Sequence, residues 1–62
     1  MWKSIEEKKP KNKEMILIRC VGSSIPEVGI WEDFGDGKSE VYIPAYDDVE
    51  LITNIEKWSP IP

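Results

Sequence analysis

The chain has no histidine, a single cysteine and no long apolar run, and each of these absences excludes a class of function. Without histidine, and with no serine or threonine beside an evident base, most metal-dependent and nucleophilic chemistry lacks its residues. The longest aliphatic stretch, Met15 to Ile18, is far shorter than the roughly 18 residues of a membrane-spanning helix. The N-terminus also has no apolar segment typical of a secretory signal. We therefore expect a non-enzymatic protein of the cytoplasm, without metal or other cofactor.

Cys20 cannot form a disulfide within this chain, because it has no second cysteine to pair with. A lone cysteine is compatible with a reducing compartment, and inside an apolar run it usually packs as a small hydrophobic residue. We expect Cys20 to be buried and unreactive, since only Arg19 lies close enough in sequence to lower its pKa.

Length and charge indicate one small domain over residues 1–62 with a polarised surface. A chain of this size buries only about 60% of the surface that it exposes when unfolded. The formal charge is −4, which argues against an open nucleic-acid interface because such interfaces depend on Lys and Arg. Residues 1–26 carry a net charge of +3, whereas residues 27–62 carry −7. The first segment is thus basic and the remainder acidic, which bears on the choice of partner.

Alternating apolar residues predict a β-rich fold. Met15–Val21 is apolar on both faces and therefore predicts a central strand, and a second strand is expected over Glu27–Asp33, with Val28 and Ile30 on one side and Trp31 on the other. Gly35, Asp36 and Gly37 predict a hairpin loop within residues 34–39, followed by a third strand that contains Val41 and Ile43. Pro44 limits that strand and places it at a sheet edge or a bend.

The two ends of the chain carry weaker signals. Ser4 and Glu7 have the spacing of a capping box, but Pro10 restricts any helix there to one turn. Residues 47–48 predict a turn, residues 49–52 a short extended piece, and residues 55–58 a last strand before an extended, proline-rich tail. Trp58 is expected to be structural, with the tail folded against the core. The predicted fold class is mainly β: a three- or four-stranded antiparallel meander with one short N-terminal helical turn.

Two patterns suggest ligand sites but lack the required context. Gly37-Lys38-Ser39 matches the end of a phosphate-binding loop, yet Glu32 stands where that motif needs glycine, and a strand follows where it needs a helix. The acidic groups within residues 33–40 and 47–50 lack the ligand order of a calcium loop. We interpret both as polar turns.

Several motifs together resemble a known family. They are Trp2-x-Ser4-Ile5 ahead of Pro10, the strand residues 16–18, Gly29-x-Trp31, and the ending Trp58-Ser59-Pro60-Ile61-Pro62. The chain resembles small phage and prophage proteins that are classed only as a domain of unknown function, with W-x-S-[IV] at the start and H-W-x-P-[LI]-P at the end. Lys57 replaces the family's usual histidine. The resemblance implies a phage or prophage origin, action in the bacterial cytoplasm and no established activity.

Two functions remain open. In the first, the protein binds and modulates a host protein, with acidic turns that select the partner and one aromatic ring as the apolar anchor. The candidate acidic residues are Asp33, Asp36, Asp47, Asp48 and Glu50. The candidate anchors are Trp31, Tyr42 and Tyr46, and we expect at least two of these three rings in the core. In the second, a homo-oligomer sequesters a small anionic, nucleotide-like ligand through Lys8, Lys9, Lys11 and Lys13. A homodimer formed at an open sheet edge is expected in either case.

Overall fold

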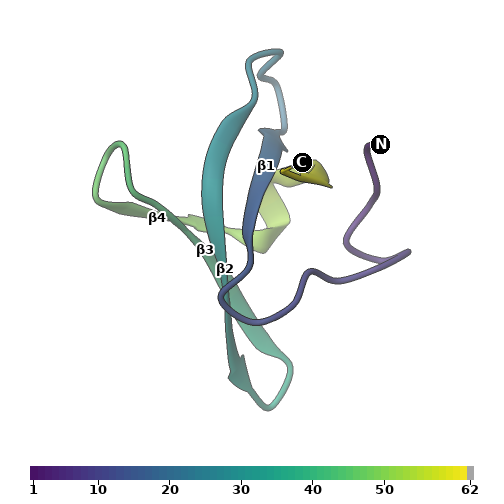
Figure 1. Cartoon of the computed structure of the whole chain (residues 1–62), viewed down its shortest axis with the longest axis vertical. Coiled ribbons are helices and arrows are strands. Elements are labelled where there is room, and N and C mark those ends of the chain that lie inside the picture. The colour runs from purple at the N-terminus through teal and green to yellow at the C-terminus, as the bar shows by residue number, and fades with distance from the viewer. Residues whose placement is uncertain (62) are drawn as a thin grey trace.

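The computed structural model describes residues 1–61 and contains one antiparallel sheet of five strands (Figure 1). The elements are β1 (Met15–Cys20), β2 (Glu27–Gly35), β3 (Lys38–Ile43), β4 (Asp48–Leu51), the 3₁₀ turn η1 (Ile52–Asn54) and β5 (Ile55–Pro60). The strand order is β4-β3-β2-β1-β5. The mainly-β prediction is confirmed, but the sheet has five strands rather than three or four. No helix among residues 1–61 is long and apolar enough to cross a membrane.

Strand β1 is central, as its two apolar faces predict, because it pairs with β2 on one side and with β5 on the other. Ile16 and Ile18 are fully buried and face the core. The neighbouring strands alternate in the same way, and Trp31 on β2 is 1% exposed. The core consists of Ile16, Ile18, Trp31, Val41, Ile43, Ile55 and Trp58. We call the sheet face turned away from this core the outer face.

The loop between β2 and β3 is a tight two-residue turn. Asp36 and Gly37 have φ angles of 52° and 74°, so both central residues adopt the left-handed conformation that a type I′ hairpin requires. Asp and Gly tolerate this region better than most residues. The hairpin predicted from Gly35, Asp36 and Gly37 is confirmed.

The sheet must be strongly curled, because η1 joins its two outermost strands. A flat sheet of five strands separates its edges by about 19 Å, at about 4.8 Å per strand. Leu51 ends β4 and Ile55 begins β5, and four residues of extended chain span at most about 14 Å. Curling shortens the gap between these strand ends and encloses the core on the concave face.

The N-terminal segment forms a hydrogen-bonded turn rather than the predicted helical turn. The capping-box contacts are present: the Glu7 amide donates to Ser4 Oγ at 3.1 Å, and the Ser4 amide donates to Glu7 Oε1 at 3.3 Å. The Lys8 amide donates to the Ser4 carbonyl at 3.2 Å, but no helix follows. Pro10 is buried and explains the stop, since it has no amide with which to continue the turn.

The sheet edges differ from those expected. Pro44 was expected to place the third strand at a sheet edge or at a bend. It lies in the turn after β3, so the bend is observed. Strand β3 pairs with both β2 and β4 and is not an edge strand. The β5 edge is covered, because the amides of Lys3 and Trp58 donate to each other's carbonyls at 2.7 and 2.8 Å. Strand β4 is the edge that the segment 1–14 leaves uncovered. It is only four residues long, which is typical of protected edges.

Candidate functional site

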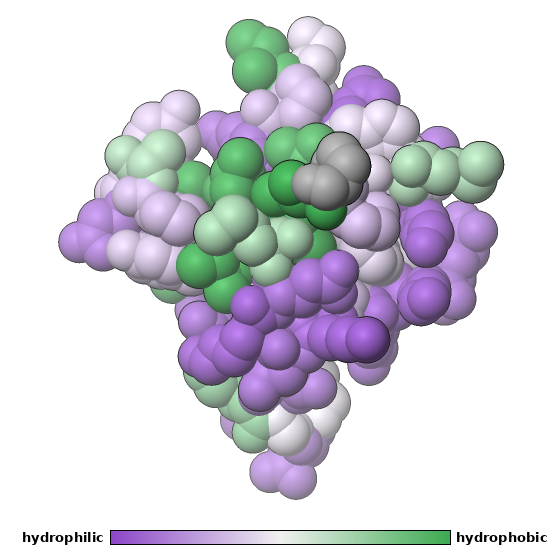
Figure 2. All heavy atoms as spheres, viewed as in Figure 1, coloured by the Kyte–Doolittle hydropathy of each residue, from purple (hydrophilic) through white to green (hydrophobic). Residues whose placement is uncertain are grey.

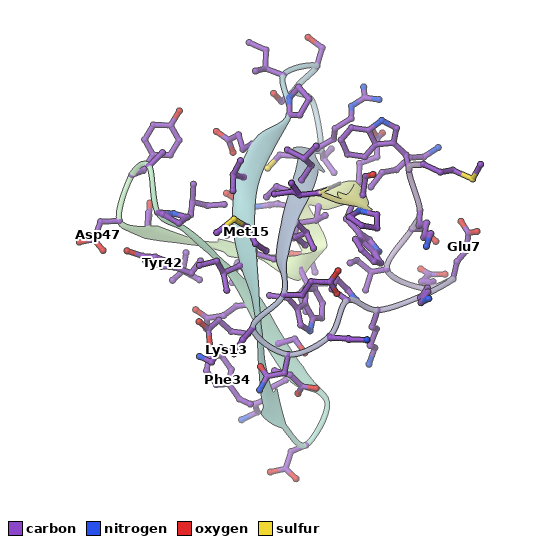
Figure 3. The ribbon with its side chains drawn as sticks, viewed as in Figure 1. Glu7, Lys13, Met15, Phe34, Tyr42 and Asp47 are labelled. Carbon is purple, nitrogen blue, oxygen red and sulfur yellow. The ribbon has the colours of Figure 1, made fainter. Side chains whose placement is uncertain are left out.

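The β3–β4 hairpin contains five of the predicted partner-binding residues, and four of them, Tyr42, Tyr46, Asp47 and Asp48, lie in or near its turn. The Tyr42 hydroxyl donates a hydrogen bond to Asp47 Oδ1 at 2.7 Å, which connects the strand to the turn (Figure 3). This hydrogen bond raises the pKa of Tyr42, because it stabilises the protonated phenol. Asp48 Oδ1 accepts a hydrogen bond from the Val49 amide at 2.8 Å. Tyr46 lies in the same turn and is 69% exposed, so the hairpin presents an aromatic ring beside two exposed carboxylates.

The other two predicted aspartates lie at the opposite end of β3. Asp33 precedes the β2–β3 turn and Asp36 lies in it, and both are exposed. The six residues of β3 span about 20 Å at roughly 3.4 Å per residue. The structure therefore divides the predicted acidic surface into two separate hairpin ends: the β3–β4 end carries the exposed ring of Tyr46, and the β2–β3 end carries the exposed ring of Phe34.

Trp31 cannot be the exposed anchor, because its ring is buried in the core. We expected at least two of the three candidate rings in the core, and this was wrong: Tyr42 is half-buried on the outer face and Tyr46 is exposed. Glu50 is half-buried on the concave side, where its Oε1 accepts a hydrogen bond from Asn54 Nδ2 at 2.8 Å. Sequence alternation assigned the faces correctly but could not show which face is covered.

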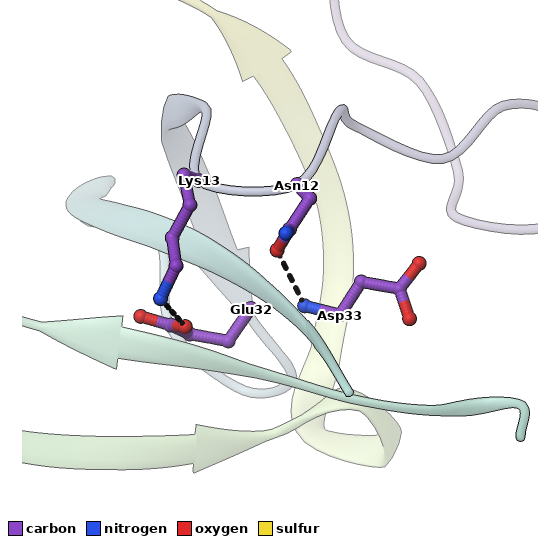
Figure 4. A network of polar contacts seen from close by, with 4 residues as sticks. All are labelled: Asn12, Lys13, Glu32 and Asp33. Carbon is purple, nitrogen blue, oxygen red and sulfur yellow. Dashed lines mark hydrogen bonds and ion pairs between the residues drawn. The ribbon is translucent and has the colours of Figure 1, made fainter. Parts of the chain in front are cut away.

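The four lysines of the basic segment do not form a common site within residues 1–61. Lys13 makes an ion pair with Glu32 and its amide donates to the Trp31 carbonyl, so it belongs to the β2 side of the sheet (Figure 4). Next to it, Asn12 Oδ1 accepts a hydrogen bond from the Asp33 amide at 2.9 Å. Lys8, Lys9 and Lys11 are exposed along the preceding loop.

A shallow cavity of about 300 Å³ lies away from all the predicted residues. Three isoleucines and two glutamates are among its lining residues, which are Ser4, Ile5, Glu6, Ile52, Thr53, Ile55 and Glu56. It forms where the N-terminal turn meets η1 and β5. Sequence reasoning missed it because the N-terminal turn is far along the chain from the consecutive segments η1 and β5.

Cys20 packs against the core but remains partly accessible. Burial raises the pKa of its thiol, and the negative charges of Glu50 and Glu27 raise it further, with a hydrogen bond from Sγ to Glu27 Oε2 at 3.9 Å. A thiol of raised pKa is a poor nucleophile. Among residues 1–61, no group of three or more His, Cys, Asp and Glu side chains is placed to hold a metal ion.

Comparisons with protein-family models, with curated proteins and with solved structures find no match to this chain. The resemblance to small phage proteins therefore stays a prediction.

Proposed function

We propose that the chain is a non-enzymatic protein-binding module, of phage or prophage origin, that binds a host protein in the bacterial cytoplasm through its β3–β4 hairpin. The observation that carries this proposal is the exposed ring of Tyr46 beside Asp47 and Asp48. Large apolar rings commonly supply most of the affinity of an interface, and charges around them steer the encounter. A partner with a basic border around an apolar pocket fits this hairpin.

The Tyr42–Asp47 hydrogen bond supports this assignment because it fixes the turn before binding. A preformed loop loses less conformational freedom on association than a mobile one. The turn also has two backbone hydrogen bonds, from the Tyr46 amide to the Ile43 carbonyl at 3.2 Å and from the Asp47 amide to the Pro44 carbonyl at 3.3 Å. Tyr46 is therefore held in a defined position while its ring stays in solvent.

The opposite hairpin provides a matched control for the charges. Asp36 and Asp47 both have positive φ, at 52° and 49°. Asp33 and Asp48 each accept a hydrogen bond from a nearby backbone amide, that of Gly35 at 2.9 Å and that of Val49 at 2.8 Å. Asparagine tolerates the left-handed region and keeps a side-chain oxygen acceptor. The double variants Asp47→Asn/Asp48→Asn and Asp33→Asn/Asp36→Asn thus remove equal charge from equivalent positions.

The test is affinity capture from a bacterial lysate followed by association and dissociation rates with the captured protein. We expect Asp47→Asn/Asp48→Asn to slow association several-fold at low salt and to weaken its salt dependence, while the Asp33→Asn/Asp36→Asn control leaves both unchanged. Tyr46→Ala should speed dissociation by about tenfold or more, as is typical of a central anchor. A captured partner whose rates respond equally to both double variants, or not at all to Tyr46→Ala, would contradict the proposal.

A further inference from the structure

Four apolar side chains form a square in the middle of the outer face. Met15 lies opposite Ile30, and Leu17 lies opposite Val28, in the β1–β2 register. These positions alternate with the buried Ile16 and Ile18, so they point away from the core. Met15 is 53% exposed and Val28 is 42% exposed, while Leu17 and Ile30 are half-buried. We call these four residues the outer square.

The outer square continues towards the β4 edge. In register, Ile30 lies opposite Tyr42, and Tyr42 lies opposite Val49, which is 43% exposed. One row of apolar side chains therefore crosses four strands. Figure 2 shows the molecule in the direction of Figure 1, with apolar side chains in the middle of the view and hydrophilic side chains below them. A continuous apolar area of this kind on a small protein is typical of an interaction surface.

Charged residues of opposite sign border the outer square on its two sides. On one side, Glu32 of β2 lies directly opposite Glu40 of β3. On the other side, Arg19 of β1 lies directly opposite Lys57 of β5. Like charges directly opposite each other destabilise a sheet, and this sheet contains two such pairs on the same face.

The monomer compensates only part of this repulsion. Lys13 neutralises Glu32, but in the described part of the chain Glu40, Arg19 and Lys57 make no ion pair. Arg19 lies against the Trp2 ring, at 5.9 Å from the guanidinium carbon to the ring centroid, and its Nε is buried without a hydrogen-bond acceptor among residues 1–61. The two borders therefore have unmatched charge of opposite sign.

We propose that a second copy of this chain covers the outer face, with the two outer squares in contact across a two-fold axis. A two-fold contact requires a patch that is complementary to itself. Here an axis that runs between the acidic and basic borders brings Glu32 and Glu40 of each copy towards Arg19 and Lys57 of the other. Because the outer face of the curled sheet is convex, these long side chains are suited to reach across where the backbones diverge.

This arrangement differs from a dimer formed at the β4 edge. The Val49 amide already donates to Asp48, so the edge offers one donor fewer to an added strand. Packing of the outer faces also leaves the β3–β4 turn at the margin of the contact, where Tyr46 remains exposed. The proposal is independent of the host partner, since neither the outer square nor its charged borders include Tyr46, Asp47 or Asp48.

Complementary charge reversal provides the test, with sedimentation equilibrium as the measurement. We expect the unaltered chain to dimerise, and we expect Glu40→Lys and Lys57→Glu each to weaken dimerisation by about tenfold or more, as observed for close charge pairs in other interfaces. An equimolar mixture of the two variants should recover a dimer, because Lys at position 40 of one variant then meets Glu at position 57 of the other, while the second contact pairs the unaltered Glu40 with the unaltered Lys57. Asp36→Lys adds the same charge on the β2–β3 turn and should leave the equilibrium unchanged.

Three results would overturn the proposal. The first is a chain that stays monomeric up to millimolar concentration. The second is a dimer that persists in both charge-reversed variants, which would indicate the β4 edge or another surface. The third is a mixture that dimerises no better than its components. If a charge-reversed variant loses its circular-dichroism signal, the neutral variants Glu40→Gln and Lys57→Gln are measured instead. Each removes a charge without reversing it and should still weaken the dimer. A failure here leaves the hairpin test unaffected.

Discussion

Trp58 Nε1 donates a hydrogen bond to the carbonyl oxygen of Lys8 at 2.8 Å and so connects β5 to a loop fifty residues earlier in the chain. The ring is 2% exposed, and the Trp58 backbone also pairs with Lys3. One residue therefore contributes to the core and also holds the N-terminal segment against β5.

We expect Trp58→Ala to cost about 3–5 kcal/mol of the free energy of unfolding, which leaves so small a domain largely unfolded. Trp58→Phe keeps most of the apolar ring but loses the indole donor, and it should cost about 1–2 kcal/mol. For a domain of this size the phenylalanine variant should therefore lower Tm by about 4–16 °C. Thermal unfolding followed by circular dichroism measures the loss of stability in both Trp58 variants. The control is Trp2→Phe, at a tryptophan that is half-buried. An unchanged midpoint in Trp58→Ala would contradict a structural role.

Gly29 is required because β3 approaches it closely. A Cβ atom at this position would lie 2.3 Å from Val41 Cγ1 and 3.4 Å from Ile43 Cδ1. The valine side chain is short and has few rotamers, so it cannot move aside cheaply. We expect Gly29→Ala to destabilise the fold by about 1–3 kcal/mol through overpacking.

A double-mutant cycle checks this cause. Val41→Ala removes the clashing methyl, so Gly29→Ala should cost less in that background than in the unaltered chain, with a coupling of about 0.5–3 kcal/mol. Additive effects in urea unfolding would show that the cost of Gly29→Ala comes from another source.

Local patterns predicted the strands well, because alternation and turn residues act over short distances. The Asp36-Gly37 turn and the two faces of β1 follow directly from the sequence. The extra strand and the order of the strands depend on how η1 returns the chain to the far side of the sheet, and no local pattern encodes this. The N-terminal capping box formed its hydrogen bonds without forming a helix, because Pro10 and the pairing of Lys3 with Trp58 override the local preference.

The candidate site was predicted less well for the same reason. Asp33 and Asp48 look equivalent in the sequence, but β3 separates them. The outer square depends on cross-strand register, which brings Met15 beside Ile30 although they lie fifteen residues apart. Burial of Trp31 rather than Tyr42 depends on which face the curled sheet encloses.

The Tyr42–Asp47 hydrogen bond should make the hairpin sensitive to alkaline pH. The bond raises the pKa of Tyr42 in the folded chain above its ordinary value of about 10. The stabilisation is therefore fully present below that ordinary value and is lost as pH rises through the higher pKa of the folded state. Spectrophotometric titration of tyrosinate should show the raised pKa of Tyr42, and Asp47→Gly, which removes the acceptor and tolerates the positive φ, should return it towards the ordinary value. A titration identical in the two proteins would show that the bond is absent in solution.

Cys20 should react slowly with alkylating reagents, because burial and then the charges of Glu50 and Glu27 raise the pKa of its thiol and so lower its thiolate fraction. We expect iodoacetamide to modify Cys20 more slowly at pH 8 than it modifies a small-molecule thiol. Glu50→Gln removes one negative charge but keeps an oxygen acceptor for Asn54, so it should raise the rate a few-fold by lowering the pKa. Glu56→Gln, at an exposed position of β5, is the matched control and should have no effect. The pH dependence separates this cause from greater access: a change in pKa moves the midpoint of the rate profile, whereas greater access raises the rate at every pH. If Glu50→Gln raises the rate without moving the midpoint, the electrostatic explanation is wrong.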